Sequence, residues 1–244
     1  AMLATANLRL HKISSNYPAV SAAFPREDRS AKLQDLDMSE DVCKPVQRSL
    51  GVRWDTNSEC FTFRVSYERK PFTKRGVLST TNSLYDPLGL AAPVTIQGKS
   101  LLREMTNHLE ERQLEEWDQP LPDELKPSWD NWCDPLVNLQ RVQVPRAYST
   151  IPPKDATRVE LHVFCDASTR GIAAVAYFKV FLSDGTIEVS FVIGKAKLAP
   201  LHATTIPRLE LCAAVLAVEL GDLIKEEQAI ELVLQPTTPI ARSC

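Results

Sequence analysis

The sequence lacks a surplus of positive charge, a close cysteine pair and a long apolar run, and each absence excludes a class of protein. The 244 residues carry a formal net charge of −3, so contact with nucleic acid must rest on local patches or bound metal ions. The six cysteines form no Cys-x-x-Cys motif, which argues against a zinc site or a disulfide framework. Without a signal peptide or a bilayer-spanning run, we expect an intracellular protein, cytoplasmic or nuclear, not secreted and without a membrane partner.

Several catalytic motifs are also missing. An aspartic peptidase needs Asp-Ser-Gly or Asp-Thr-Gly, whereas Asp184-Gly185-Thr186 has the letters in another order and predicts a hairpin turn. The segment 98–100, Gly-Lys-Ser, lacks the upstream glycine of a phosphate loop and lies in a helical stretch. The histidines are isolated and favour surface or packing roles; they are His11, His108, His162 and His202.

What is present predicts a folded chain of one or two domains, because 44% of the residues are apolar and 24% are charged. Alternation on both sides of a turn at 55–58 predicts a β-hairpin. A helix is expected to end near Tyr85, because Asp-Pro follows it. Helical spacing then covers 95–116, and a shorter helix is expected within 125–140.

The last third of the chain gives the clearest pattern. Strands are predicted at 158–166, 172–182 and 187–193, and a helix at 205–225. Three antiparallel strands followed by a helix predict an α+β fold. The first strand alternates, and one of its faces carries Val159, Leu161, Val163 and Cys165. The expected apolar stripe of the helix consists of Leu209, Cys212, Ala213, Leu216, Leu220 and Leu223, and Cys165 and Cys212 are expected to be small core residues.

Two acids, Asp166 and Glu210, stand in otherwise apolar surroundings. Asp166 ends an apolar strand, and Glu210 shares the segment 206–218 with one other charged residue, Arg208. A carboxylate on an apolar helix face costs several kcal/mol unless it is paired or binds a metal. Because carboxylate oxygens suit Mg²⁺ or Mn²⁺, the two acids are candidate metal ligands and catalytic residues.

Structural explanations compete with this hypothesis. An aspartate at a strand end is commonly a turn or cap residue. Acids are favoured in the first turn of a helix by its dipole, so Glu210 needs no metal there. Glu210 could also pair with Arg208 or Lys197. These alternatives stay open on the residues alone.

Basic and aromatic residues of the first half give a weaker signal. Candidate contacts with nucleic-acid phosphates are Lys12, Lys74 and Arg75, although solvated surface positions explain them equally well. Trp117, Trp129 and Trp132 favour packing anchors of a Pro- and Trp-rich linker over stacking platforms.

Several motifs carry a family resemblance. Segment 164–168, Phe-Cys-Asp-Ala-Ser, and the following 171–177 resemble the first-strand motif of retroelement ribonuclease H. Segment 205–211, Thr-Ile-Pro-Arg-Leu-Glu-Leu, resembles the helix that carries the second acid of that family. The amino-acid sequences of these motifs are similar to those of Pao/BEL-type LTR retrotransposon Pol polyproteins.

Segments upstream of these motifs agree with this resemblance. Segments 74–79 and 83–89 resemble the region that joins reverse transcriptase to ribonuclease H, and 7–12 and 49–54 resemble the last strands of the polymerase palm. The resemblance covers about residues 5 to 234 in the expected order. It implies a palm end with a primer-grip-like hairpin at 1–70, a helical connecting region at 71–117, a Pro/Trp-rich linker with a short helix at 118–157, a truncated ribonuclease H-like mixed sheet at 158–234 and a disordered tail at 235–244.

The resemblance also implies an activity, which is hydrolysis of the RNA strand of an RNA–DNA hybrid with two Mg²⁺ or Mn²⁺ ions. Asp166 matches the acid that bridges both ions, and Glu210 matches the acid that binds one. Expected partners in the intact family are the hybrid and other Pol segments.

The departures from the family predict that this activity is absent. The third acid of the family lies in a segment similar to Trp-Thr-Asp-Ser, whereas residues 230–236 of this chain are Ile-Glu-Leu-Val-Leu-Gln-Pro. The polymerase motif Tyr-x-Asp-Asp is also missing. We therefore expect a Pol fragment with negligible hybrid cleavage, which need not bind a metal. The alternative is a non-catalytic scaffold that binds nucleic acid or protein, and the peptidase label that is attached to this family is less favoured.

Overall fold

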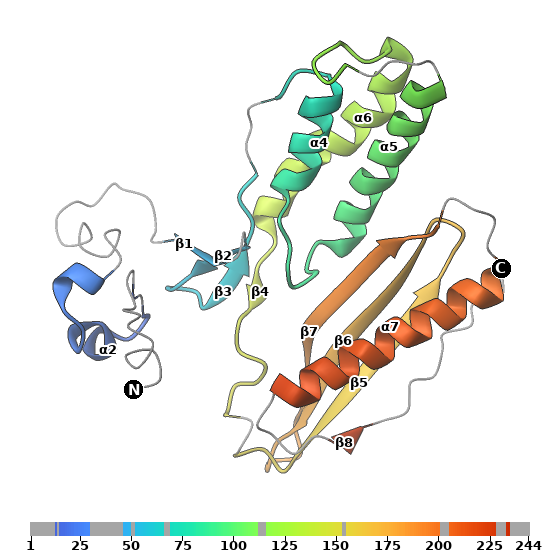
Figure 1. Cartoon of the computed structure of the whole chain (residues 1–244). Helices are drawn as coiled ribbons and strands as arrows, with labels where there is room; N and C mark the ends of the chain where they lie inside the picture. The colour runs from blue at the N-terminus through green and yellow to red at the C-terminus, as the bar shows by residue number, and fades with distance from the viewer. Residues whose placement is uncertain are drawn as a thin grey trace, which may run out of the picture.

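A main sheet, one long helix across it and a group of shorter helices at its end make up most of the computed structural model (Figure 1). The structure describes residues 13, 15–29, 46–49, 52–65, 69–111, 116–152, 155–200, 205–227 and 233–234. Within these ranges, none of the helices is long and apolar enough to cross a membrane.

A small antiparallel sheet forms the first part, in the order β1-β2-β3-β4. Its strands are β1 (Val46–Ser49), β2 (Val52–Asp55), β3 (Cys60–Thr62) and β4 (Val144–Pro145), preceded by α2 (Pro18–Ala22) and η1 (Arg26–Asp28). The predicted hairpin is confirmed, because Trp54 in β2 pairs with Phe61 in β3 across a turn at 56–59. Lys12 lies outside the described residues.

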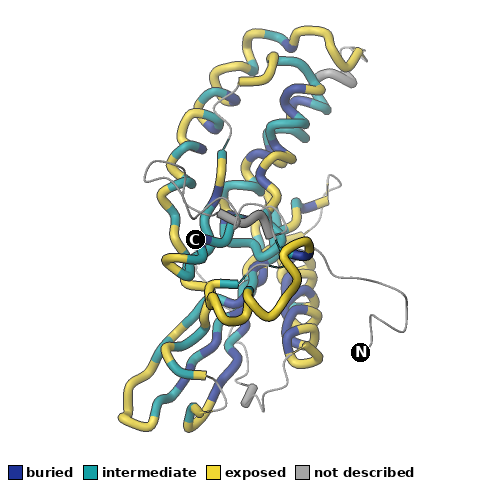
Figure 2. Tube along the Cα trace, turned by 90° about the vertical axis from the view of Figure 1, so that its left-hand side faces the viewer, coloured by how far each residue is buried: buried dark blue, intermediate teal, exposed yellow. Residues whose placement is uncertain are grey.

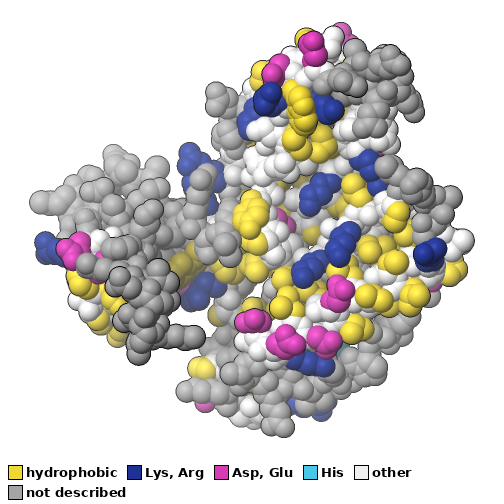
Figure 3. All heavy atoms as spheres, viewed as in Figure 1, with side chains coloured by type: hydrophobic (Ala, Val, Ile, Leu, Met, Phe, Trp, Pro, Cys, Tyr) yellow, Lys and Arg dark blue, Asp and Glu magenta, His cyan; other side chains and the backbone are white. Residues whose placement is uncertain are grey.

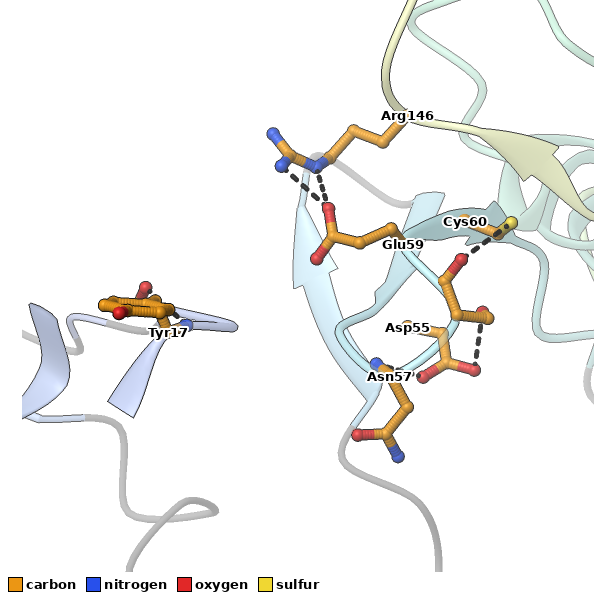
Figure 4. Close-up of polar contacts among 8 residues, drawn as sticks. Tyr17, Asp55, Asn57, Glu59, Cys60 and Arg146 are labelled. Carbon is orange, nitrogen blue, oxygen red and sulfur yellow. Dashed lines mark hydrogen bonds and ion pairs between the residues drawn. The ribbon is translucent and has the colours of Figure 1, made fainter. Parts of the chain in front are cut away.

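Strand β4 reaches this hairpin from the linker and is held there by Arg146. The Arg146 guanidinium donates to Glu59 Oε2 at 2.7 and 2.9 Å (Figure 4). The same guanidinium lies 4.8 Å from the ring centre of Trp54. The turn itself is organised by Asp55, which accepts from the backbone of Asn57 at 3.0 Å and from Ser58 Oγ at 2.9 Å. The linker is therefore part of the small sheet, a pairing that local sequence does not reveal.

A helical bundle follows the small sheet. It consists of α4 (Lys74–Ser83), α5 (Ala92–Glu111), η3 (Asp123–Leu125), α6 (Lys126–Cys133) and η4 (Asp134–Arg141). Thr73 caps α4 by accepting from Gly76 N at 3.1 Å, and α4 ends close to the predicted Tyr85. Asp86 then accepts from the backbone of Leu90 and Ala91 at 2.9 and 2.6 Å, which explains why α5 begins earlier than predicted.

Two of the three tryptophans of this region are packing anchors, as predicted. Trp129 and Trp132 are buried, and Trp132 Nε1 donates to the Val94 carbonyl at 3.0 Å. Trp117 differs, because it is 45% exposed and lies under the Lys74 ammonium at 4.9 Å.

The main sheet has the order β7-β6-β5-β8. It is built from β5 (Arg158–Ala167), β6 (Gly171–Phe181), β7 (Ile187–Leu198) and β8 (Val233–Leu234), with α7 (Ile206–Glu227) between β7 and β8. β5, β6 and β7 are antiparallel, as predicted, and β8 adds a short parallel partner to β5. The expected α+β fold is confirmed.

Helix α7 covers one face of this sheet (Figures 1 and 2). The alternation predicted for β5 is confirmed, because Val159, Leu161 and Val163 are buried in the core beneath the helix. The predicted apolar stripe of the helix is partly wrong. Cys212 and Leu223 are exposed, so Cys212 is not a core residue. Their places are taken by Ala217, Gly221 and Ile224. Gly221 packs over Val163, where an added Cβ would make an ordinary van der Waals contact at 3.7 Å.

Backbone contacts join the bundle to one end of the main sheet. Gly194 N donates to the Leu88 carbonyl at 2.8 Å, and a Cβ on Gly89 would lie 2.0 Å from the Gly194 oxygen. The Arg103 side chain donates to the Ala199 carbonyl, and a Cβ on Gly171 would meet Ile96 at 2.9 Å. Small residues on both sides therefore let α5 and its preceding loop lie against β6 and β7.

Candidate functional site

Asp166 lies near the C-terminal end of β5, an interior strand, where it pairs with Ala173 of β6. Strand alternation puts its side chain on the same face as Phe164, away from the face that α7 covers. Asp166 is exposed and lines a cavity of about 720 Å³ between α5 and this end of the sheet. Other walls of the cavity include Ile96, Ser100, Phe164, Tyr177, Phe191 and Lys195.

The turn after β5 is organised by Ser168, so Asp166 does not serve as its capping residue. Ser168 N donates to the Gly171 carbonyl at 2.9 Å, and Ser168 Oγ accepts from the backbone N–H groups of Arg170 and Gly171 at 3.3 Å. Among the described residues, Asp166 makes no hydrogen bond and no ion pair. Burial first, and then the charge of Asp166, raise the pKa of the neighbouring Cys165 thiol.

Glu210 lies near the start of α7 and is exposed. The expectation that it sits on a buried apolar face is therefore wrong, because the adjacent Leu209 points into the core instead. The desolvation argument for a metal at Glu210 fails with it. Within the described ranges, Glu210 forms no ion pair with Arg208 or Lys197, so that alternative finds no support either.

The two acids share one end of the sheet but not one cavity. β7 ends at Leu198, which pairs with Gly171, and α7 begins soon afterwards at Ile206 (Figure 1). Asp166 lines the cavity on the bundle side, whereas Glu210 belongs to the helix on the other face and is not part of the cavity wall. A cation shared by the two carboxylates stays a prediction.

Strand β8 is the parallel neighbour of β5 in the described sheet. Val233 pairs with Glu160 in a parallel ladder, and parallel strands advance together. Residues 235–244 contain no Asp and no Glu.

The donors among the described residues do not fit a two-metal centre. Across the described part of the chain, no group of three or more His, Cys, Asp and Glu side chains could hold a metal ion. Such a centre needs several carboxylates around both ions, and Asp166 and Glu210 alone do not supply them.

The basic candidates lie away from the Asp166 cavity, at the start of α4. Arg75 is held by Asp118, with N···O distances of 2.7 and 3.1 Å, and this contact lowers the pKa of the Asp118 carboxyl. Lys74 is occupied by the Trp117 ring. The cations in the cavity wall are Arg170 and Lys195, which sequence reasoning missed.

A sequence signal existed for only part of the cavity. Phe164 precedes Asp166 by two positions in the alternating strand, so their shared face could have been read directly. Phe164 also touches Tyr177 across the sheet, with ring centres 6.2 Å apart. No local sequence pattern predicted that α5 forms a wall of the cavity, because the contact of α5 with the sheet depends on tertiary packing.

The strand order β7-β6-β5-β8 with α7 on one face defines a ribonuclease H-like α+β domain. The sequence model of the Pao retrotransposon-like RNaseH-like domain family matches residues 73–235. This match covers more than half of the chain, so the chain belongs to that family. The matched segment starts at the bundle, which is consistent with the contacts that join the bundle to the sheet. No curated protein matches the chain.

Proposed function

We propose that the chain is a segment of a retrotransposon Pol polyprotein whose ribonuclease H-like domain does not cleave an RNA–DNA hybrid by itself. The observation that carries the proposal is the setting of Asp166. Its carboxylate is exposed at the end of an interior strand and has no protein partner among the described residues, as expected for a former ligand position. The stretch beyond β8 offers no acid to accompany it.

In the intact family, Asp166 and Glu210 would correspond to two ligands of the Mg²⁺ or Mn²⁺ ions that activate water and stabilise the leaving oxygen. Because the described residues hold no group of three or more such ligands, no catalytic step is assigned to this chain. Loss of one member of a catalytic set that acts as a unit removes most of the rate.

A cleavage assay on a labelled RNA–DNA hybrid tests the proposal, with Mg²⁺ and Mn²⁺ in separate reactions and a complete ribonuclease H as positive control. We expect the chain and its Asp166→Asn variant to give the same background. Asp184→Asn is the matched control, because Asp184 is an exposed acid of the same sheet at its other end. Cutting that Asp166→Asn abolishes and Asp184→Asn preserves would overturn the proposal.

Non-catalytic binding of nucleic acid is the second candidate, and it is favoured by Arg170 and Lys195 in the cavity wall. Fluorescence anisotropy with a hybrid over a series of salt concentrations measures it. If the cavity side binds phosphates, Arg170→Ala should weaken binding and reduce the salt slope by about 1, because each phosphate contact releases counterions. Arg75→Ala should change little, since Asp118 already holds that guanidinium.

Two further assignments have less support. The β2–β3 hairpin supports a palm-end origin for residues 1–70. A peptidase is not favoured. Asp184 lies in the β6–β7 turn, where it accepts from Thr186 N at 2.8 Å. Asp166 is level with Ala173 at the opposite end of β6, roughly 25 Å away at the usual rise per strand residue. The two aspartates therefore cannot form a dyad.

A further inference from the structure

Helix α7 carries a second apolar stripe that the main sheet does not cover. Leu211, Val215 and Val218 are 65%, 51% and 63% exposed. At 100° per residue they lie together on one side of the helix, opposite the buried stripe that contains Ala213 and Leu220. Figure 3 shows hydrophobic side chains gathered over α7 on the face turned toward the viewer.

This stripe has no charged residue in its middle. Residues 211–218 are all uncharged. A helix with one face in a core is normally polar on the other face, so an apolar outer stripe marks a surface that binds another element. At 1.5 Å per residue the stripe from Leu211 to Val218 is about 10 Å long, and the span from Arg208 to Asp222 on the same side is about 21 Å, enough for one helix–helix contact.

The charges at the two ends of the stripe differ in sign. Arg208 stands at the start, and Glu219 and Asp222 stand toward the end. Asp222 also contacts Lys225 at 3.5 Å on its own helix and is 60% exposed, so its carboxylate can accept a further donor. This polarity is self-complementary only when a second copy runs in the opposite direction.

We propose that this face of α7 is the interface of a symmetric homodimer in which the two α7 helices pack antiparallel about Val215. Arg208 precedes Val215 by seven residues, and Asp222 follows it by seven. An antiparallel pair therefore sets Arg208 against the partner's Asp222 twice, as a two-fold axis requires. A parallel pair would bring like charges together.

Sedimentation and light scattering of the full chain test the interface. A dimer is expected at tens of micromolar, and Val215→Glu should weaken association by about tenfold or more, because it buries a charge at the centre of the contact. Val189→Glu is the matched control: Val189 is 66% exposed, but it lies on β7, so this variant should still dimerise. Thermal unfolding checks that both variants fold.

Charge exchange tests the direction of packing. Arg208→Asp and Asp222→Arg should each weaken the dimer, and the double variant should restore it, since the pair is then reversed.

Cross-linking tests the register in a Cys212→Ser background. Val215→Cys should form a chain-to-chain disulfide on oxidation. Leu211→Cys should not, because the two copies lie about 12 Å apart along the helix axes, beyond the reach of a disulfide.

Three results would overturn the proposal. They are a monomer at every concentration, a dimer that Val215→Glu leaves intact, and a double charge variant that is no better than the single ones. Efficient cross-linking through position 211 together with position 215 would show parallel packing and would also contradict it.

Discussion

The two ends of the main sheet are held in different ways. The Asp166 end is held by contacts between backbone atoms. Gly194 N donates to the Leu88 carbonyl, and there is no room for a side chain at Gly89. At the hairpin end, the linker is held by Glu188. Its carboxylate accepts from Ser149 Oγ and Thr150 Oγ1 at 2.7 Å each and from Thr150 N at 3.0 Å.

This difference has a chemical consequence. Backbone contacts do not titrate, so the geometry around Asp166 should be insensitive to pH. The contacts of Glu188 depend on its negative charge, so the docking of the linker at the other end should weaken in acid. The end of the sheet that carries Asp166 should thus be the more constant of the two as the pH changes.

The largest expected effect comes from filling the backbone contact at Gly89. Gly89→Ala places a Cβ 2.0 Å from the Gly194 oxygen at a φ of +75°, so the loop and β7 must separate. We expect a loss of about 3 kcal/mol or more in the free energy of unfolding, measured by urea denaturation.

The matched control is Gly185→Ala in the β6–β7 turn. Gly185 also has a positive φ, +86°, but no atom lies within 4 Å of the added Cβ. Gly185→Ala should therefore lower the free energy of unfolding only by the backbone strain, about 1 kcal/mol. Equal losses at the two glycines would contradict the close backbone contact at the Asp166 end.

A smaller effect is expected from acid at the hairpin end. Hydrogen bonds from Ser149 and then Thr150 lower the pKa of Glu188 below its ordinary value of 4.5. A lowered folded-state pKa adds stability above the unfolded value, and that contribution is lost as the pH falls through the folded value. Chemical denaturation between pH 7 and pH 3 should show this loss.

Glu188→Gln should remove this part of the pH dependence, because it removes the charge. A Ser149→Ala, Thr150→Val double variant should reduce it, because only the hydrogen bond from the backbone N–H of residue 150 remains. An acid limb that is identical in all three proteins would show that Glu188 does not distinguish the two ends.

The smallest expected effect is in thiol chemistry. Burial first, and then the charge of Asp130, raise the pKa of Cys133 to about 11, whereas Cys212 is exposed on α7. Since the thiolate is the reactive form, alkylation at pH 8 followed by mass spectrometry should modify Cys212 well before Cys133. Asp166→Asn should speed the reaction of Cys165 slightly, because it removes a charge that raises the pKa of that thiol. Equal rates at Cys133 and Cys212 in the folded chain would contradict this order.

Local pattern was sufficient where one face of an element is buried. The alternation from Val159 to Cys165 gave β5 and its core face, and Asp184-Gly185 gave the β6–β7 turn. Local sequence pattern was not sufficient where tertiary contacts determine which residues of an element are buried. Helical spacing predicted Cys212 in the core because it leaves the rotation of a wide apolar surface undetermined, and contacts with the sheet bury Ala213, Leu216 and Ala217 instead.

The candidate site divides in the same way. Asp166 could be singled out from the sequence, because it breaks an apolar strand at its end. The exposure of Glu210 could not, since residues on both sides of it are apolar whichever face of α7 is buried. The α5 wall of the cavity depends on contacts between segments far apart in the chain, which no local pattern records.

The central claim is that Asp166 and Glu210 are the remainder of an incomplete set of metal ligands. Titration with Mn²⁺, followed by electron paramagnetic resonance, tests it directly on the full chain and on Asp166→Asn. The account predicts no spin-coupled pair of ions in either protein. Two coupled Mn²⁺ ions per chain that disappear in Asp166→Asn would contradict it.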